Sequence, residues 1–387
     1  MKPVVVLAPD KFKGTLTASQ VAGHLAEGIT AARPDVCIRR VPVADGGEGT
    51  VDAATHAGFV AVGLDVVGPT GEPVRARYAR RGDEAVVELA EASGLSLLPH
   101  GPTRTTALTA TSYGTGQLLA AALDAGCRRI VLGIGGSACT DGGAGFLQAL
   151  GARITDAAGQ PIRPGGQGLL DADHLDLTGL PDLTGVDLVV ACDVDNPLLG
   201  PHGAAAVYGP QKGADGAVTA TLDAALERWG RLVTRSTGED HTRDRGAGAA
   251  GGAGFAALAV LGARMRPGAQ VMLQLGGLQQ ALDGATLLVT GEGRLDRQTL
   301  HGKAPAAVAA AGREAGVPVV AVVGTCVLTE PQVHEIGLVG VHALTDEPDV
   351  RGEAELAMRR PGLLLARIGT EVARRYLPAA GEPAALG

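Results

Sequence analysis

The stretch VVVLAPDKFKG occupies residues 4–14 and opens with a short, unbroken apolar run. Such a run is typical of a parallel strand that is buried on both faces of its sheet. Asp10 to Gly14 then forms a loop, and Thr17 or Ser19 can cap a helix that extends to about Ala32. The N-terminus therefore predicts a buried strand, a charged loop and a helix.

The same alternation of strand and helix recurs near both ends of the chain. The further strands that we expect there are Cys37–Val43, Thr286–Thr290, Val317–Val323 and Leu338–Leu344. Strands that alternate with helices predict an α/β fold with a doubly wound parallel sheet. Two strands from one end and three from the other form one five-stranded sheet if the two ends meet in space.

The sequence pattern in the middle of the chain differs from that at the two ends and predicts an inserted α/β domain. Turn signals in residues 60–90 favour hairpins, and further strands are expected at Arg129–Gly133 and Asp187–Cys192. We therefore expect a discontinuous domain made of residues 1–64 and 286–387, with residues 65–285 inserted into it.

Composition excludes several classes of protein. Among 387 residues, 33 Lys and Arg face 41 Asp and Glu, a net charge of −8, and aromatic residues make up only 2%. This balance argues against a nucleic-acid partner. No apolar run is long enough for a membrane helix and no signal peptide is visible, so we expect a cytoplasmic protein without a membrane partner. The five cysteines contain no C-x-x-C pair, which indicates reduced thiols rather than disulfides or zinc.

The most informative motif runs from Gly133 to Gly145 and reads GIGGSACTDGGAG. It follows an expected strand and precedes a helical pattern. Glycines in that position let backbone N–H groups approach an anion, and the start of a helix adds partial positive charge. The candidate phosphate-binding residues are Gly135, Gly136, Ser137, Thr140, Asp141, Gly142 and Gly143. The alternative is a plain glycine-rich turn in which Asp141 caps the helix.

Charged residues gather at the other expected strand ends, where ligands bind in open α/β sheets. The candidate acids are Asp10, Asp45, Asp193 and Glu292, and the candidate phosphate-binding cations are Lys13, Lys212 and Lys303. Carboxylates on such loops suit Mg²⁺ or a substrate hydroxyl. The structural alternatives are a solvated loop at 10–13, an acidic helix start after Asp45 and an Asx turn before Pro197.

Two functional classes follow from these residues. Anion-cradling glycines, acidic strand ends and a few lysines are the parts that a phosphotransfer enzyme needs. A non-catalytic binder of small molecules with the same architecture is the alternative. The chain has no P-loop motif, and the G-x-G-x-x-G at residues 246–251 does not follow an apolar strand, which argues against a dinucleotide fold.

Taken together, the motifs resemble the bacterial type 1 glycerate kinases. The blocks that match, in order, are APDKFKG at 8–14, PVADGGEGT at 42–50, residues 133–145, CDVDNPL at 192–198, GPQKGA at 209–214, and TGEGRLD at 290–296 followed by Gly302 and Lys303. Six blocks in order, from Val5 to about Gly324, are far more specific than any one of them. Beyond about Thr325 the match is poor.

This resemblance implies Mg²⁺- and ATP-dependent phosphorylation of D-glycerate at its 2-hydroxyl. It also implies that the discontinuous domain is flavodoxin-like, with the active site in the cleft between the domains. In that setting, residues 135–143 hold nucleotide phosphates and Lys13 holds the substrate carboxylate or the transferred phosphoryl group. Asp45 and Asp193 bind the metal or orient the hydroxyl, and Asp10 is a further catalytic candidate.

Several points stay open at the level of sequence. Lys11, Tyr113 and the pair Cys139-Thr140 depart from the family pattern, which puts fine substrate preference in question. A glycerate 3-kinase, a kinase of a related hydroxy acid and a homo-oligomer all remain compatible. We also expect hinges near Gly63–Gly71 and Asp283–Ala285, with Lys13, Asp45 and Glu292 on one wall of the cleft and Ser137, Asp141 and Asp193 on the other.

Overall fold

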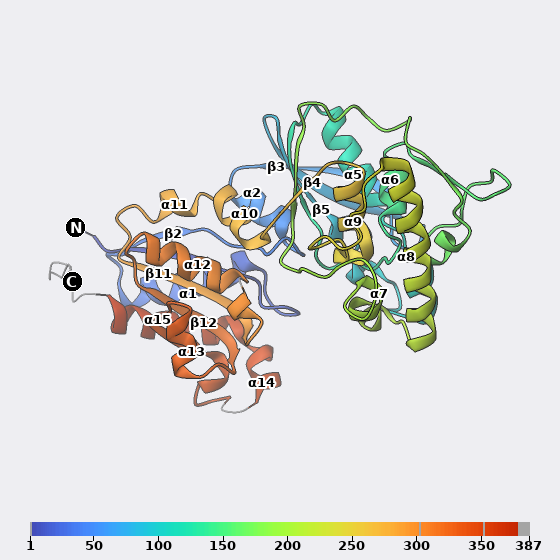
Figure 1. The fold of residues 1–387 in the computed structure, drawn as a ribbon. Helices are drawn as coiled ribbons and strands as arrows, with labels where there is room; N and C mark the ends of the chain where they lie inside the picture. The colour runs from blue at the N-terminus through green and yellow to red at the C-terminus, as the bar shows by residue number, and fades with distance from the viewer. Residues whose placement is uncertain (1, 302, 351–352, 378–387) are drawn as a thin grey trace. The chain divides into compact units, whose positions relative to one another are not determined.

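The computed structural model describes residues 2–301, 303–350 and 353–377, and the chain divides into two compact units. Unit 1 consists of residues 1–45, 52–57 and 269–387, and unit 2 of residues 46–51 and 58–268. The colours of Figure 1 follow this division, because blue and orange-to-red segments form unit 1 and mainly cyan to yellow segments form unit 2. Helix α2 (Thr50–His56) contributes residues to both units.

Unit 1 is a three-layer α/β structure. Its strands are β1 (Val4–Pro9), β2 (Cys37–Arg40), β11 (Leu287–Leu295), β12 (Val319–Cys326) and β13 (Gly340–Ala343). Its helices are α1 (Ala18–Ala32), α10 (Gly268–Leu275), α11 (Leu278–Ala281), α12 (Ala304–Glu314), α13 (Glu330–Glu335), α14 (Ala354–Arg359) and α15 (Pro361–Tyr376), with short 3₁₀ turns at Thr299–His301 and Leu344–Asp346.

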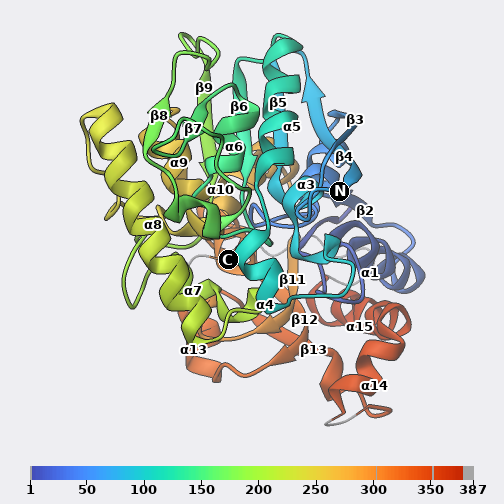
Figure 2. The same cartoon turned by 90° about the vertical axis from the view of Figure 1, so that its right-hand side faces the viewer.

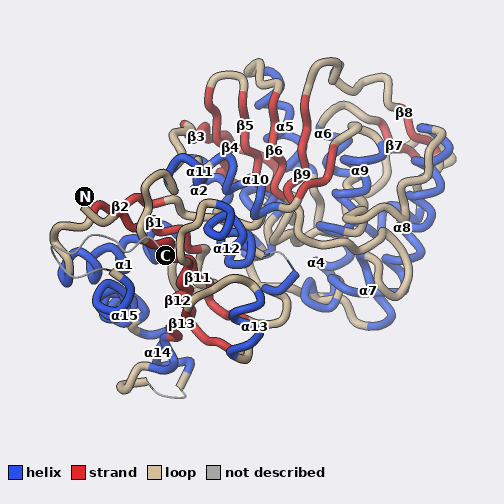
Figure 3. Tube along the Cα trace, turned by 60° about the vertical axis from the view of Figure 1, so that its left-hand side comes forward, coloured by secondary structure: helices blue, strands red, loops and turns tan. Residues whose placement is uncertain are grey.

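The unit 1 sheet is parallel throughout, in the order β13-β12-β11-β1-β2. Strand β1 therefore lies between β2 and β11, and the two ends of the chain meet in one sheet as expected. The apolar run in β1 serves both faces: Val5 and Leu7 pack toward α1 and α15, whereas Val6 and Ala8 join the core with α12. Figure 3 shows α1 and α15 on one side of these strands and α12 on the other.

Helices α1 and α15 pack unusually closely because glycines face the partner backbone. A Cβ atom at Gly28 would come within 1.8 Å of the Ala366 carbonyl oxygen, and one at Gly369 within 2.6 Å of the Leu25 carbonyl oxygen. The side chain of Thr17 accepts a hydrogen bond from the Gln20 N–H in a capping box, so the expected helix start is confirmed.

Unit 2 contains a mixed six-stranded sheet in the order β10-β9-β6-β5-β4-β3. Figure 2 shows β9, β6 and β5 side by side in this sheet. These strands are β3 (Val60–Val67), β4 (Pro73–Arg81), β5 (Glu84–Glu88), β6 (Arg129–Gly133), β9 (Asp187–Ala191) and β10 (Arg264–Arg266), beside a small antiparallel pair of β7 (Arg153–Thr155) and β8 (His174–Asp176). Strands β3, β4 and β5 pair antiparallel, as the turn signals predicted, whereas β5, β6, β9 and β10 pair parallel.

The helices of unit 2 are α3 (Leu89–Ser93), α4 (Arg104–Thr109), α5 (Tyr113–Asp124), α6 (Ala144–Ala149), α7 (Ala204–Tyr208), α8 (Gly216–Thr237) and α9 (Ala253–Ala259). Short 3₁₀ turns lie at Leu95–Leu97, Gly166–Leu170, Pro210–Lys212 and Ala249–Gly252. Its core includes Trp229, which is fully buried on α8. Within the described part of the chain, no helix is both long and apolar enough to cross a membrane.

The unit boundaries differ from the domain boundaries that the sequence suggested. The expected boundary at 64/65 falls inside β3, whose residues pair with β4 along the whole strand and so stay in unit 2. At the other crossing, the chain enters unit 1 at Ala269 rather than at 286. The reason is that Ala269, Leu273 and Leu278 pack into the unit 1 core with Val41 and its neighbours.

Candidate active site

In unit 1, two acidic residues lie toward the carboxyl ends of two neighbouring strands of the sheet, β1 and β11. Asp10 comes directly after β1, and Glu292 lies near the end of β11. The Asp10 N–H donates to the Gly291 carbonyl oxygen at 2.8 Å, which fixes the two strand ends beside each other. The strand order changes direction between β1 and β11, and ligands of open α/β sheets bind at such a switch point.

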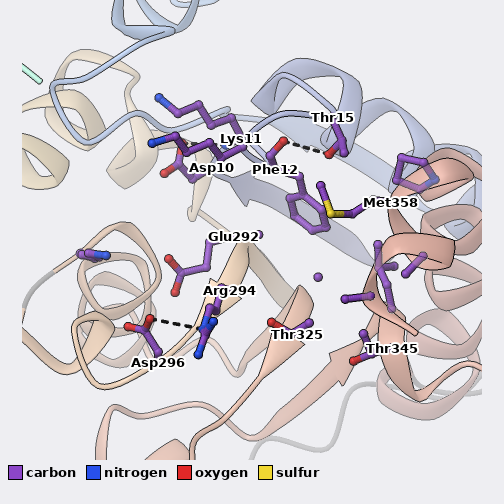
Figure 4. A pocket seen from close by; sticks show the side chains of 18 of the residues that line it. Asp10, Lys11, Phe12, Thr15, Glu292, Arg294, Asp296, Thr325, Thr345 and Met358 are labelled. Atoms are coloured by element: carbon purple, nitrogen blue, oxygen red, sulfur yellow. Dashed lines mark hydrogen bonds and ion pairs between the residues drawn. The ribbon is translucent and has the colours of Figure 1, made fainter. Parts of the chain in front are cut away.

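A pocket of about 450 Å³ opens at this edge, entirely within unit 1 (Figure 4). Its charged lining residues are Asp10, Lys11, Lys13, Asp45, Glu292, Arg294, Asp296 and Lys303. Its other lining residues are Phe12, Thr15, Gly293, Gly324, Thr325, Leu344, Thr345, Ala354, Ala357, Met358 and Pro361. Five residues that the sequence singled out, from three distant segments, thus meet in one pocket: Lys13, Asp10, Asp45, Glu292 and Lys303.

Two carboxyl groups in this pocket, those of Asp10 and Glu292, are held where ionisation is unfavourable. Burial, together with the nearby negative charge of Asp45, raises the pKa of Asp10 to about 8. Burial also raises the pKa of Glu292 to about 7, although its Oε1 accepts a 2.5 Å hydrogen bond from the Thr299 hydroxyl. An acid with a pKa near neutrality can exchange a proton with a substrate, so Asp10 and Glu292 are candidates for proton transfer.

Cationic side chains surround the same pocket. Lys13 is exposed, and the Lys303 ammonium donates to the Gln298 side chain at 2.8 Å. The Arg294 guanidinium lies 3.6 Å from the Asp296 carboxylate, as the dashed line in Figure 4 shows. Exposed ammonium and guanidinium groups beside buried acids suit an anionic ligand such as a phosphate or a carboxylate.

In unit 2, the glycine-rich motif forms the turn between β6 and α6. Asp141 is fully buried there, and its Oδ2 accepts hydrogen bonds from the Ser112 N–H and hydroxyl, both at 2.8 Å. Its Oδ1 accepts from the Gly143 N–H at 3.1 Å. The carboxylate therefore accepts hydrogen bonds from the turn itself and from residues at the starts of α5 and α6, and it stabilises all three. This arrangement supports the structural alternative, a turn stabilised by Asp141, rather than direct contact of this side chain with a ligand.

Lys212 also lies inside unit 2 rather than at its surface. Its side chain is 1% exposed, and its ammonium donates to the Ser137 hydroxyl at 2.8 Å and to the Cys139 carbonyl oxygen. Burial lowers the pKa of this ammonium. Thr140 is fully buried as well. Lys212 thus ties the glycine-rich motif together from within, and the residues of the motif that reach the surface are Gly135 and Gly136.

The same motif is held from behind by α8. The Trp229 indole N–H donates to the Gly142 carbonyl oxygen at 2.9 Å. Gly142 has a φ of +63°, and a Cβ atom there would lie 2.4 Å from the Trp229 ring. The glycine at this position is therefore required by packing as well as by backbone conformation.

Glu88 is a residue that sequence reasoning missed. It ends β5, is 4% exposed, and accepts hydrogen bonds from the backbone N–H groups of Gly49 at 3.1 Å and Val51 at 3.0 Å. It thereby holds the loop after Asp45 against the unit 2 sheet, where the loop also packs through Gly46. No pattern in the sequence links Glu88 to a loop so far before it, because the contact depends on tertiary packing.

Asp193, the remaining candidate acid, follows β9 in unit 2. One of its carboxylate oxygens accepts a hydrogen bond from the Gly268 N–H at 2.7 Å. Neighbouring Asn196 bonds to the Tyr208 hydroxyl at 2.5 Å and to the His202 carbonyl oxygen at 2.8 Å. Nowhere in residues 2–301, 303–350 and 353–377 do three or more His, Cys, Asp or Glu side chains form a group that could hold a metal.

Comparison with known proteins agrees with this architecture. The model of the "Glycerate kinase family" matches residues 5–377, so the family match extends through the C-terminal segment, whose motifs had suggested a poor match. A "Glycerate kinase" of Bacillus subtilis strain 168 is 43% identical over 338 residues, covering 86% of this chain and 88% of that protein. A "Glycerate 2-kinase" of Escherichia coli K12 is 41% identical over 347 residues, covering 88% and 90%.

A solved structure gives the same result at the level of the fold. The solved structure titled "Crystal structure of putative glycerate kinase 2 from Salmonella typhimurium LT2" superposes with a TM-score of 0.81 at 39% sequence identity. The match covers 97% of this chain and 98% of that one. Both the sequence and the fold therefore match over nearly the full length, and the chain belongs to the glycerate kinase family.

Proposed function

We propose that this protein transfers the γ-phosphoryl group of ATP to the 2-hydroxyl of D-glycerate, giving 2-phosphoglycerate and ADP. The family supports the kinase reaction, and the relative named glycerate 2-kinase supports attack by the 2-hydroxyl. The observation that carries the proposal is the pocket at the switch point of the unit 1 sheet, which combines acids of raised pKa with several cations. The strand order of unit 1, 2-1-3-4-5 in chain order, supports its assignment as a flavodoxin-like domain.

In this proposal Asp10 is the general base. With a pKa of about 8, its carboxylate is basic enough to accept the proton of the attacking hydroxyl as the oxygen–phosphorus bond forms. The bond from phosphorus to the bridging oxygen of ADP breaks in the same step, and ADP leaves with the electron pair. The protein's contribution beyond this proton transfer is positioning and charge stabilisation, as in phosphoryl transfer generally.

The cations divide between the two anionic reactants. Lys13 holds the carboxylate of glycerate or the transferred phosphoryl group, and Lys303 lies at the start of α12, where it can reach a phosphate. Residues 135–143 stay our predicted contact for nucleotide phosphates. Within that range, Gly135 and Gly136 are the residues that reach the surface of unit 2. The Gly135 N–H donates to the Gly46 carbonyl oxygen at 3.0 Å, so the backbone N–H of Gly136 is our candidate for the phosphate contact.

In this proposal, Mg²⁺ is bound by protein carboxylates together with the phosphates of the nucleotide. The described residues form no three-ligand metal group, and Mg²⁺ in kinases is commonly held by one or two carboxylates together with substrate phosphates. Asp45, which lines the pocket, would hold it in this way, and Asp193 stays a second candidate. When bound, the ion neutralises charge on the phosphates.

Phosphorus NMR of the product tests the proposed reaction. We expect a 2-phosphoglycerate resonance and stoichiometric ADP when the protein is incubated with ATP, Mg²⁺ and D-glycerate. A 3-phosphoglycerate resonance would refute the choice of hydroxyl, and turnover only with another hydroxy acid would refute the substrate. Binding of both ligands without formation of ADP would instead establish the non-catalytic alternative.

The Lys13→Ala variant tests the site. We expect it to lower kcat by about 100-fold, the usual effect of removing a group that stabilises transition-state charge. Lys2→Ala is the matched control, because Lys2 is exposed on the same unit and does not line the pocket. Full activity of Lys13→Ala at saturating substrate would contradict the assignment.

A further inference from the structure

The pocket in unit 1 is larger than the proposed acceptor requires. Its volume of about 450 Å³ lies in the range of pockets that enclose drug-sized ligands. Glycerate, by contrast, is a three-carbon acid whose carboxylate and hydroxyl groups need charged and polar partners. The charged lining residues supply these partners. The remaining part of the pocket is therefore available to a different chemical group, such as part of the second substrate.

The pocket lining is divided by chemistry. In Figure 4, Asp10, Glu292 and Asp296 lie on one side, and Phe12, Met358 and Thr345 lie on the other. Leu344 and Ala357 also line the pocket and belong to the same buried cluster as Phe12, so the lining around Phe12 is mainly apolar. A small polar substrate gains little from contact with such a surface. The faces of a flat aromatic ligand, by contrast, stay exposed to water unless they pack against an apolar surface.

This apolar side is an opening in the core of unit 1, not a chance group of surface side chains. Phe12, Leu344 and Ala357 are 4%, 2% and 3% exposed and belong to the core that packs α1 and α15 on the sheet. Met358, on α14, is 51% exposed at the rim. A rigid floor with a flexible thioether at its edge is suited to holding a planar ring.

A nucleotide matches this division. Its base is flat and largely apolar on both faces, and its polyphosphate is anionic. With the base against the apolar side, the phosphates extend toward the charged lining residues of the pocket, which include Lys11, Lys13 and Lys303. The hydroxyls of Thr325 and Thr345 line the same pocket and offer hydrogen bonds to the edge of a base.

We propose that the apolar side of this pocket, formed by Phe12, Leu344, Ala357 and Met358, binds the purine base of the nucleotide. This inference rests on the proposed kinase function and locates the base in unit 1. It also assigns a role to the C-terminal part of unit 1, because Leu344, Ala357 and Met358 are three of the four apolar residues. Met358 is the residue to test, because it lies at the rim rather than in the core.

Steady-state kinetics of Met358→Ala give the first test. We expect the KM for ATP to rise about tenfold, the effect of losing a little over 1 kcal/mol of apolar contact with the base. The kcat and the KM for D-glycerate should not change, and Met358→Leu should restore the KM for ATP. Leu363→Ala is the matched control, since Leu363 is 52% exposed on the neighbouring helix α15 and lies outside the pocket.

Calorimetry separates this inference from the proposed function. ADP should bind Met358→Ala about tenfold more weakly than the parent protein, whereas inorganic tripolyphosphate, which has no base, should bind both equally. This result would uphold the base site even if glycerate were not phosphorylated, in which case the proposed reaction alone would fail. An unchanged affinity for ADP, or a rise in the KM for glycerate in place of ATP, would overturn the inference.

Discussion

The carboxyl group of Asp10 lies in an environment that disfavours its ionised form. The group is desolvated at the end of β1, and the charges of Asp45 and Glu292 raise its pKa further. Such a group weakens the folded state when it ionises, yet it is basic enough to accept a proton near neutral pH. Both consequences can be measured on a single substitution.

The first consequence is kinetic. The kcat/KM of the parent protein should rise with pH toward a plateau, with its midpoint near the pKa of about 8 that burial gives Asp10. Asp10→Asn removes the base, so its kcat on the plateau should be lower by about 100-fold or more. Asp283→Asn, an exposed residue of the same unit outside the pocket, serves as control. A pH–rate profile that keeps both its height and its midpoint in Asp10→Asn would exclude the assigned role.

The second consequence is thermodynamic. The folded-state pKa is raised from 3.8 to about 8, so between these values the folded protein binds more protons than the unfolded chain. The free energy of unfolding contributed by Asp10 therefore falls as pH rises through this window. Asp10→Asn cannot ionise, and it should melt at a higher temperature than the parent, with a gain that grows from about pH 4 to about pH 8. A gain that is equal at both ends of the window would contradict the linkage.

Among the elements of unit 2, β5 stabilises the loop that precedes α2, a role that its own sequence does not predict. It ends in Glu88, whose buried carboxylate accepts hydrogen bonds from Gly49 and Val51 at the start of α2. Since buried N–H groups are costly when they lose their acceptor, this one side chain holds the loop that follows Asp45. The strand thus stabilises a loop that is far from it in the sequence.

Replacing this carboxylate tests the role of the strand end. Glu88→Ala should lower the free energy of unfolding by about 2 kcal/mol, because the buried Val51 N–H and the half-buried Gly49 N–H lose their acceptor. Glu88→Gln keeps one acceptor oxygen and should cost less. The matched control is Glu84→Ala on the same strand, whose ion pairs with Arg81 and Arg129 are partly exposed and are worth at most about 1 kcal/mol. Urea denaturation measures all three, and equal losses for Glu88→Ala and Glu84→Ala would refute the argument.

At the scale of the whole molecule, the chain builds two units with separate cores. Trp229 is the single tryptophan of the sequence and lies in the core of unit 2. Its fluorescence therefore reports the unfolding of unit 2, whereas far-UV circular dichroism reports both units. Proteins of several domains commonly depart from two-state unfolding, so the two signals need not coincide.

The two spectroscopic signals can be compared in the Asp10→Asn variant above pH about 8, where the gain in stability of the variant over the parent protein is largest. Asp10 belongs to unit 1, so the substitution should shift the circular dichroism transition and leave the tryptophan fluorescence transition in place. Trp229→Phe, studied in parallel, identifies the fluorescence signal. Equal shifts of both transitions would show instead that the two units unfold as one cooperative structure.

The sequence by itself determined the elements and most of the chemistry of the pocket. Unbroken apolar runs such as Val4–Ala8 predict strands that are covered on both faces, and the sheet of unit 1 has a core on each side. Acids and lysines directly after such strands must lie at one edge of a parallel sheet. For this reason the amino-acid pattern predicts that Asp10 and Glu292 lie at the same edge of the sheet, and the pairing of β1 with β11 in the structure makes them neighbours.

Only the tertiary structure decided where the side chains of the glycine-rich motif point. The motif spacing is equally compatible with a ligand contact and with an internal hydrogen bond, and the Asp141 side chain is buried in the structure. Lys212, from the separate block at 209–214, is buried against the motif as well. Tertiary packing also decided the position of Glu88 and the apolar side of the pocket, where Phe12 meets Leu344 and Met358. Residues from opposite ends of the chain become neighbours only when β1 inserts beside β11, and no local pattern encodes that pairing.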